Sequence, residues 1–577
     1  MARFSTRAIE VHSGYVWNFD WVRKTIEFAR RHDMTSLALH RNDIVDMVVY
    51  PGKLFGASGA GTNIFERYRE IFPKLYKYTP TRRSGPYQRR DYLRRVIDLA
   101  ARNGIDVWFE NKELSFPDIL LELNPQLVKN GTLCPNDPFW WDFVDTKYTE
   151  LFQDLPGIAG IITAPGTGES RLAISSNRCT CEACRGSTPQ GWYRKLIMAM
   201  HKPIRAAGRE LVVRDFVFDK KAQTELAETI AGLPSDVIVS LKNTPHDYYP
   251  TFPDNPRLGD VGDHRQWVEF DTMGQYFGWG IGPAVITDDY RRRMETALRH
   301  GVVGMILRTD WESLDGHSCF HTPNRLNLHA AAALALNADV GDREIHRSWL
   351  TETGMTEPGA AKDELDAAAD WNVRLFANSW EIVSKSLFVN DCVFSDSSNY
   401  PISLDHAWWL AEEKNSLKDW DPSKENALET SEDNIRRILA EKDEALRLVE
   451  LQPGLARERP AALTEAAHRD LVGRMETFRL YVAGWRAAVR ACIFTRFLLD
   501  HPGREDAFGI EMRAASEEAF DLLRTLADEM RSYAAATDQH FSAYNMLGWE
   551  RLLTLRDDLS GRLAALSERA PDPVPAE

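Results

Sequence analysis

The sequence predicts an α/β protein, with a parallel (β/α)8 barrel over residues 1–345 and a mostly α-helical C-terminal domain over residues 346–570. Short β-branched runs alternate with longer helical stretches from residue 7 to about 340, which is the pattern of strand–helix units. Eight such runs occur, the number of strands in a TIM barrel. A doubly wound open sheet is the main alternative, but the glycine fingerprint of dinucleotide-binding sheets is missing from the first turn.

The predicted strands are apolar runs that end in polar residues. In chain order they are RAIEVHSGYVW, TSLALHRNDIVD, GIDVWFENKEL, GIAGIITAPGTGES, ELVVRDFVFD, DVIVSLKNTP, QWVEFDTMGQYFG and GVVGMILRTDW. The stretches between them have the apolar spacing of amphipathic helices, as in DWVRKTIEFARRHD, QRRDYLRRVIDLAARNG, GWYRKLIMAMHKPIRAAG and TDDYRRRMETALRHG. Several of these stretches close on a glycine just before the next strand, a common signal for the end of a helix.

The pattern changes beyond residue 350. Between residues 360 and 425 tryptophans are frequent, and the signals for loops and helices are mixed. Long amphipathic stretches follow, including SEDNIRRILAEKDEALRLVELQ and EEAFDLLRTLADEMRSYAAA, which predict a helical bundle packed on the barrel. The tail 571–577 is rich in proline and acidic residues, and we expect it to be disordered.

The composition is that of a globular protein. The 577 residues are 44% hydrophobic and carry a formal net charge of −15, which argues against nucleic acid or an anionic membrane as the main partner. No run reaches the roughly 18 apolar residues of a membrane span. The first residues lack the apolar region of a signal peptide, and the seven cysteines are an odd number. We therefore expect a cytoplasmic location.

Polar side chains follow nearly every predicted strand. Because the active site of a (β/α)8 barrel lies at the C-terminal ends of its strands, we expect these side chains to meet in one pocket. Charged groups, amides and tryptophan together are typical of sugar binding, since charged groups bond hydroxyls strongly and indoles cover sugar rings. The alternative is that strand ends simply meet solvent. The candidate sugar-binding residues are His40, Asp43, Glu113, Arg171, Arg214, Lys242, Asn243, His246, Asp271, Gln275, Arg308 and Trp311.

Two carboxylates are the candidate catalytic pair. Cleavage of a glycosidic bond needs one carboxyl group to protonate the leaving oxygen and a second to attack or to activate water. Glu169 follows the glycine-rich turn APGTGES, which lets the backbone expose a side chain. Asp247 lies just past the sixth strand. We expect Glu169 to be the acid and Asp247 the base of an exo-acting glycoside hydrolase that degrades oligosaccharides.

The stretch around Asp247 resembles glycoside hydrolase family 67, the α-glucuronidases. Lys242 to Asp247 match a Lys-Asn-Gly-Pro-Ile-Asp motif of that family, and Arg214 matches an arginine that contacts the uronate. The segment 301–350 is similar to the family's last strand and the following helix. The resemblance implies a substrate that contains uronic acid, catalysis with inversion and carboxyl groups about 6.5–9.5 Å apart. It also implies a homodimer through the helical domain.

The sequence departs from that family at the position of one catalytic base. Gln275 stands where the family has its second base carboxylate. Either Asp271 or Glu269 takes that role instead, or Asp247 is the single base. This departure keeps open a noncatalytic carbohydrate-binding barrel. A metal-assisted sugar isomerase or lyase is a third possibility, with His40 and Asp43 as metal ligands.

A cysteine cluster stands apart from these candidates. RCTCEACRG places Cys179, Cys181 and Cys184 in a C-x-C-x-x-C arrangement, which is consistent with a structural zinc site, with three free thiols, or with a redox or catalytic role. The fourth zinc ligand would be Cys134 or a histidine. Such a site would hold the loop after the fourth strand, and we expect catalysis itself to need no cofactor.

Overall fold

The predicted barrel is confirmed. The computed structural model describes residues 3–41, 44–45, 80–112, 114–170, 172–217, 220–273, 283–310, 318–537 and 547–568. Eight parallel strands close a barrel in the order β1-β10-β9-β8-β7-β6-β3-β2, so β1 pairs with both β2 and β10. The open-sheet alternative is therefore wrong. The strands are β1 (Thr6–Val11), β2 (Ser36–His40), β3 (Asp106–Glu110), β6 (Ile158–Thr163), β7 (Glu210–Arg214), β8 (Ile238–Lys242), β9 (Gln266–Asp271) and β10 (Gly304–Arg308).

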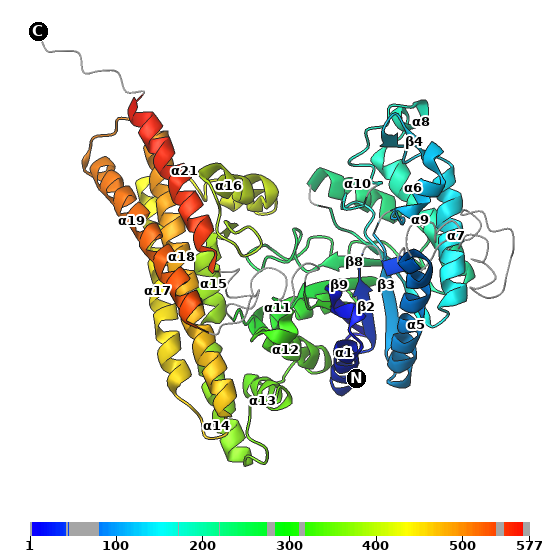
Figure 1. Cartoon of the computed structure of the whole chain (residues 1–577), viewed down its shortest axis with the longest axis horizontal. Coiled ribbons are helices and arrows are strands. Elements are labelled where there is room, and N and C mark those ends of the chain that lie inside the picture. The colour runs from blue at the N-terminus through cyan, green and yellow to red at the C-terminus, as the bar shows by residue number, and fades with distance from the viewer. Residues whose placement is uncertain are drawn as a thin grey trace, which may run out of the picture.

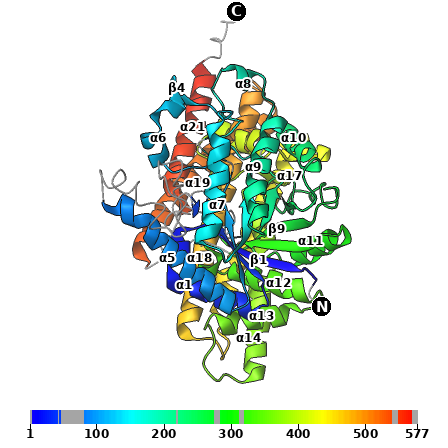
Figure 2. The same ribbon diagram turned by 90° about the vertical axis from the view of Figure 1, so that its right-hand side faces the viewer.

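Helices cover the outside of the barrel (Figures 1 and 2). They are amphipathic, as the sequence predicts, and turn their apolar side chains toward the strands. Short elements interrupt two of the connections between strands. The elements are α1 (Phe19–Arg31), α5 (Pro80–Arg102), α6 (Ile119–Leu123), β4 (Val128–Lys129), β5 (Thr132–Leu133), α7 (Phe139–Asp154), α8 (Glu182–Arg185), α9 (Pro189–Ala206), α10 (Lys220–Ala231), α11 (Thr287–Arg299) and α12 (Arg325–Leu336).

Alternation along the strands builds the barrel interior in layers. The lower layer is an apolar cluster of one residue from each strand, namely Ala8, Ala38, Trp108, Ile162, Val212, Ile238, Trp267 and Ile306. Because the side-chain period of a strand is two, the residue two positions further along each strand also faces inward. In most strands that residue is polar and buried: Glu10, His40, Glu110, Arg214, Ser240, Glu269 and Arg308. The interior therefore changes from apolar to charged toward the C-terminal ends of the strands.

The connection from β8 to β9 has no helix in its residues 243–265, all of which are described. Buried Arg293 of α11 holds this segment by donating hydrogen bonds to the carbonyl oxygens of Pro250 and Phe252, at 3.0 and 2.8 Å. Asn255 donates another to the carbonyl oxygen of Lys242 at 3.0 Å. The segment is thus fixed against the end of β8, where it carries Asp247.

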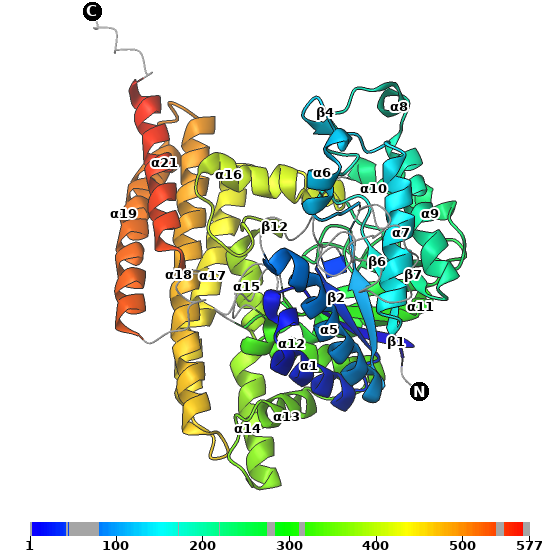
Figure 3. The same ribbon diagram turned by 45° about the vertical axis from the view of Figure 1, so that its right-hand side comes forward.

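Long helices follow the barrel and stand beside it as a bundle (Figures 1 and 3). One continuous apolar core runs from the helices of the barrel into this bundle. The predicted boundary at residue 345 lies inside α13, and the division into domains stays a prediction, as does disorder of residues 571–577, which lie outside the described residues. The elements are α13 (Asp342–Glu352), α14 (Lys362–Phe376), α15 (Ser379–Leu387), β11 (Phe388–Val389), β12 (Cys392–Val393), α16 (Leu404–Trp408), α17 (Glu432–Arg457), α18 (Glu465–Asp500), α19 (Ala507–Ala536) and α21 (Trp549–Glu568).

Within the described ranges, no helix is both long enough and apolar enough to cross a bilayer.

Candidate active site

A cavity of about 170 Å³ lies at the C-terminal ends of the barrel strands. Its wall combines residues from strand ends, from the loops that follow them, and from the segment between β12 and α17. This is the end of the barrel at which enzymes of this fold place their active sites. The lining residues are His12, Lys112, Ala164, Thr167, Glu169, Arg214, Phe216, Lys242, Asp247, Tyr249, Arg308, Ser397, Lys414 and Asn415.

Arg214 forms the floor of the cavity. Its guanidinium is buried and contacts three carboxyl groups from three other strands, those of Glu10, Glu110 and Glu269, the last at 2.7 Å. Glu269 also accepts hydrogen bonds from Ser240 at 2.6 Å and Tyr248 at 2.8 Å. A buried guanidinium held on several sides cannot change rotamer freely, so the floor is rigid.

The carboxyl groups of Glu10 and Glu110 differ in protonation state. Burial raises the pKa of Glu110 to about 8, although Arg214 acts in the opposite direction. Burial also raises the pKa of Glu10, but the guanidinium groups of Arg214 and Arg308 outweigh it and hold that pKa well below its usual range. Glu110 Oε1 has no hydrogen-bond partner among the described residues, which disfavours a charge there. At neutral pH Glu10 is therefore ionised, and Glu110 carries a proton.

Two histidines lie against these carboxyl groups. The rings of His12 and His40 are 3.4 Å apart between centroids, and both contact Glu10, at 3.0 and 2.9 Å. Burial is the largest cause that lowers the pKa of each histidine well below its usual range, so both imidazoles are neutral. Arg214 Nη1 lies 2.9 Å from His40 Nδ1. A cation bound at His40 would meet that guanidinium, which argues against the metal site considered for His40 and Asp43.

Glu169 and Lys112 form an ion pair at one side of the cavity. Glu169 follows Gly168, whose φ of 72° lies in the left-handed region, and its side chain is 36% exposed. Burial raises the pKa of Glu169, but the ammonium of Lys112 outweighs burial and lowers that pKa overall. In the ligand-free site Glu169 is therefore a carboxylate.

Asp247 and Lys242 form a second ion pair at the cavity. Lys242 is the last residue of β8, and Asp247 follows it in the next connection. Asp247 has a φ of 53°, a left-handed conformation that aspartate tolerates better than most residues. Lys242 lies 3.6 Å from the centre of the Phe216 ring and 4.5 Å from that of Tyr248. Burial lowers the pKa of Lys242, while Asp247 opposes that shift. The carboxylate is thus held at the cavity by a buried lysine with an aromatic cover.

The structure brings together five of the residues predicted from the sequence. Glu169, Asp247, Arg214, Lys242 and Arg308 all line the cavity. Four other predicted residues are buried but do not line it, namely His40, Asn243, His246 and Asp271. His40 is enclosed by Glu10, Glu110 and Arg214, and His246 Nε2 lies 3.2 Å from Asn415 Oδ1. The predicted Asp43, Glu113, Arg171, Gln275 and Trp311 lie outside the described residues.

Several lining residues are missing from the prediction. His12 extends the inward-facing series of β1 beyond Glu10, so the rule applied to the other strand ends would have found both. Lys112 extends β3 in the same way. Lys414 and Asn415 come from the segment between β12 and α17, and no rule about barrel strands can place them.

Comparisons with known proteins support the fold. No family model matches the chain, and no curated protein sequence matches it either. A glycoside hydrolase of family 138 that targets pectin rhamnogalacturonan II is 12% identical, with a TM-score of 0.59 over 100% of this chain and 70% of that enzyme. A mutant O-GlcNAc hydrolase of Thermobaculum terrenum is 11% identical, with a TM-score of 0.44 over 99% of each chain. The first similarity shows that the chain shares its fold with a glycoside hydrolase; the resemblance to family 67 stays a prediction.

Proposed function

We propose that the protein is a glycoside hydrolase that removes a terminal acidic sugar from an oligosaccharide. One observation carries this proposal: two carboxylates from different strand ends, Glu169 and Asp247, line the same small cavity beside Lys112, Lys242 and Arg308. Two carboxyl groups on either side of a glycosidic bond are the catalytic requirement of most glycosidases. The shared fold with a glycoside hydrolase agrees with this chemistry.

The charge of the cavity supports an acidic sugar. Five cationic residues line it, Lys112, Arg214, Lys242, Arg308 and Lys414, against the two carboxylates Glu169 and Asp247. A uronate carboxylate placed among these cations gains charge-assisted hydrogen bonds that a neutral sugar cannot make. The volume of about 170 Å³ is below the roughly 300–1,000 Å³ of sites for larger ligands, which favours one sugar ring and exo-cleavage.

The pairing of Lys112 with Glu169 supplies a way to make the acid. Burial favours the protonated form of Glu169, and Lys112 opposes burial. When the carboxylate of an acidic substrate draws the Lys112 ammonium away, burial is left to dominate and the pKa of Glu169 rises. Glu169 then holds a proton for the leaving oxygen, while Asp247 accepts a proton from the attacking water. Such a direct attack by water inverts the anomeric centre.

The proposal is tested by hydrolysis of matched aryl glycosides. We expect wild-type protein to cleave a nitrophenyl glucuronide or galacturonide, in the α or β series, and to cleave the corresponding glucoside or galactoside far more slowly. Cleavage of neutral glycosides alone would contradict the acidic substrate. No cleavage of any member of the panel, with saturable binding of a free uronic acid in calorimetry, would instead support a noncatalytic carbohydrate-binding barrel.

A further inference from the structure

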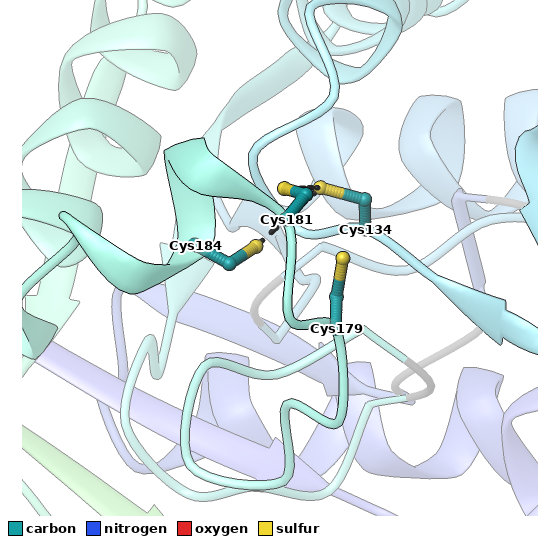
Figure 4. A group of neighbouring side chains, drawn as sticks. All are labelled: Cys134, Cys179, Cys181 and Cys184. Carbon is teal, nitrogen blue, oxygen red and sulfur yellow. Dashed lines mark hydrogen bonds between the residues drawn. The ribbon is translucent and has the colours of Figure 1, made fainter.

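Four cysteines gather outside the candidate active site. Cys134 follows β5 in the connection from β3 to α7, whereas Cys179, Cys181 and Cys184 lie in the connection from β6 to α9. Figure 4 shows the four side chains directed toward a common centre. Cys134 and Cys184 are buried, Cys179 is partly buried and Cys181 is exposed. The two segments are 45 residues apart in sequence at their nearest cysteines, Cys134 and Cys179.

The distances between the sulfur atoms match a tetrahedral thiolate site. Cys134 Sγ lies 3.6 Å from Cys181 Sγ and 3.5 Å from Cys184 Sγ, and all four sulfur atoms lie within 4.8 Å of one another. A disulfide would need about 2.0 Å. In a regular tetrahedron with zinc–sulfur bonds of about 2.3 Å, the sulfur atoms lie about 3.8 Å apart. The four cysteines therefore have the spacing of metal ligands without bonding to each other.

The surrounding backbone places the ligands and supports the sulfur atoms. Strands β4 and β5 form a hairpin whose turn residues Asn130 and Gly131 both have positive φ, 52° and 74°, the geometry of a tight type I′ turn. The indole of Trp140 donates to the carbonyl oxygen of Cys134 at 2.9 Å. Asn136 Nδ2 lies 3.5 Å from Cys184 Sγ, as a donor beside a thiolate ligand would.

These segments have too little apolar burial to order themselves. Strands β4 and β5 have two residues each and are exposed or half-buried, and α8 is a single turn of four residues in which only Cys184 is buried. Short elements without a hydrophobic core usually need a disulfide or a metal to be stable. A bound metal would supply the missing cross-link, because its binding free energy is then folding free energy.

We propose that Cys134, Cys179, Cys181 and Cys184 bind one structural Zn²⁺ ion. Zinc takes four thiolates in tetrahedral geometry, and a site with four protein ligands has no open position for substrate. Each thiol releases its proton on binding. The site would tie together the same two connections that the Lys112–Glu169 ion pair joins at the cavity. Zinc would thus fix the far end of the loop that carries Glu169.

Metal analysis of the full-length chain tests the site. We expect protein purified under reducing conditions to contain one equivalent of zinc, which remains after dialysis against EDTA. Cys181→Ser removes an exposed ligand with little effect on packing and should lose the zinc, as should Cys134→Ser. The matched control is Cys392→Ala, which removes a buried thiol elsewhere in the chain and should keep the zinc. Replacement by Co²⁺ should give the thiolate charge-transfer and visible bands of a tetrahedral site.

Other results would overturn the proposal. Wild-type chain that holds no zinc and gives no cobalt spectrum after reconstitution would exclude a metal site. Equal zinc in wild type and in both serine variants would place the metal elsewhere. Iron in place of zinc, or a disulfide at Cys134 in protein prepared without oxygen, would also contradict it. All four results are independent of glycosidase activity.

Discussion

Glu110 should make the stability of the barrel depend on pH. The folded pKa of about 8 lies above the ordinary value of 4.5, so the folded chain holds a proton that the unfolded chain has lost at neutral pH. A raised folded pKa gives stability that is fully present below pH 4.5 and is lost as pH rises through 8. Each pH unit in that window costs about 1.4 kcal/mol. Glu110→Gln copies the protonated group and removes the titration.

The comparison is made by urea unfolding at pH 5, 6 and 7. Pulse proteolysis is a suitable detection method, because barrel peptides are then followed separately from those of the helical bundle. Between pH 5 and pH 7 we expect wild type to lose on the order of 3 kcal/mol of unfolding free energy relative to Glu110→Gln. Other titrating groups are shared by the two proteins and cancel in the difference.

Glu10→Gln is the matched control in the same layer. Glu10 is ionised and pairs with Arg214 and with Arg308, the latter at 3.0 Å. Its removal takes an ionised partner from two buried cations, which costs about 3–5 kcal/mol at every pH tested. The reasoning is refuted if Glu110→Gln and wild type change in parallel with pH, because Glu110 would then be ionised in the folded protein.

Three further predictions concern the cavity. Lys112→Met should raise the pKa of Glu169, because the cation that most opposes burial is removed, and the matching limb of the kcat/KM profile should move to higher pH. Lys202→Met removes an exposed lysine and should leave the profile unchanged. Lys414→Ala should raise KM for a uronide about tenfold or more, since a hydrogen bond to a charged group contributes about 1.5–3 kcal/mol. The KM for a neutral glycoside should stay unchanged, and equal effects on both substrates would contradict this role of Lys414. The Asp247→Asn variant should have a free energy of unfolding about 1 kcal/mol higher than that of Asp247→Ala, because asparagine tolerates the left-handed φ of 53°. Equal stability of the two variants would show that residue 247 leaves the left-handed conformation when it is alanine.

The barrel could be predicted because its strands carry local signals. Runs such as DVIVSLKNTP combine β-branched residues with an abrupt polar end. Seven of the eight barrel strands lie wholly within the predicted runs, and β1 begins one residue before its run, at Thr6. The same signal identified Arg214, Lys242 and Arg308 as lining residues, since they follow the inward-facing period of their strands.

Long-range features could not be predicted in the same way. Lys414 reaches the cavity through the packing of a later segment on the barrel, and no pattern near residue 414 signals this. The sequence predicts that His40 binds sugar, but its side chain lies in the same layer as Arg214 and is enclosed by Glu10, Glu110 and Arg214. The sequence leaves the fourth member of the cysteine cluster open between Cys134 and a histidine. The fold places Cys134 beside Cys181 and Cys184.

The central claim is that Glu169 and Asp247 cleave a glycosidic bond together. The most direct test is kcat/KM of Glu169→Gln and Asp247→Asn on the best substrate of the aryl glycoside panel. Glu210→Gln is the control, because Glu210 is a partly exposed carboxylate at the opposite end of the barrel. We predict losses of about 10²–10⁴-fold for each of the two variants and none for the control, with all three proteins folded. Either variant with wild-type kcat/KM would contradict the assignment of the pair.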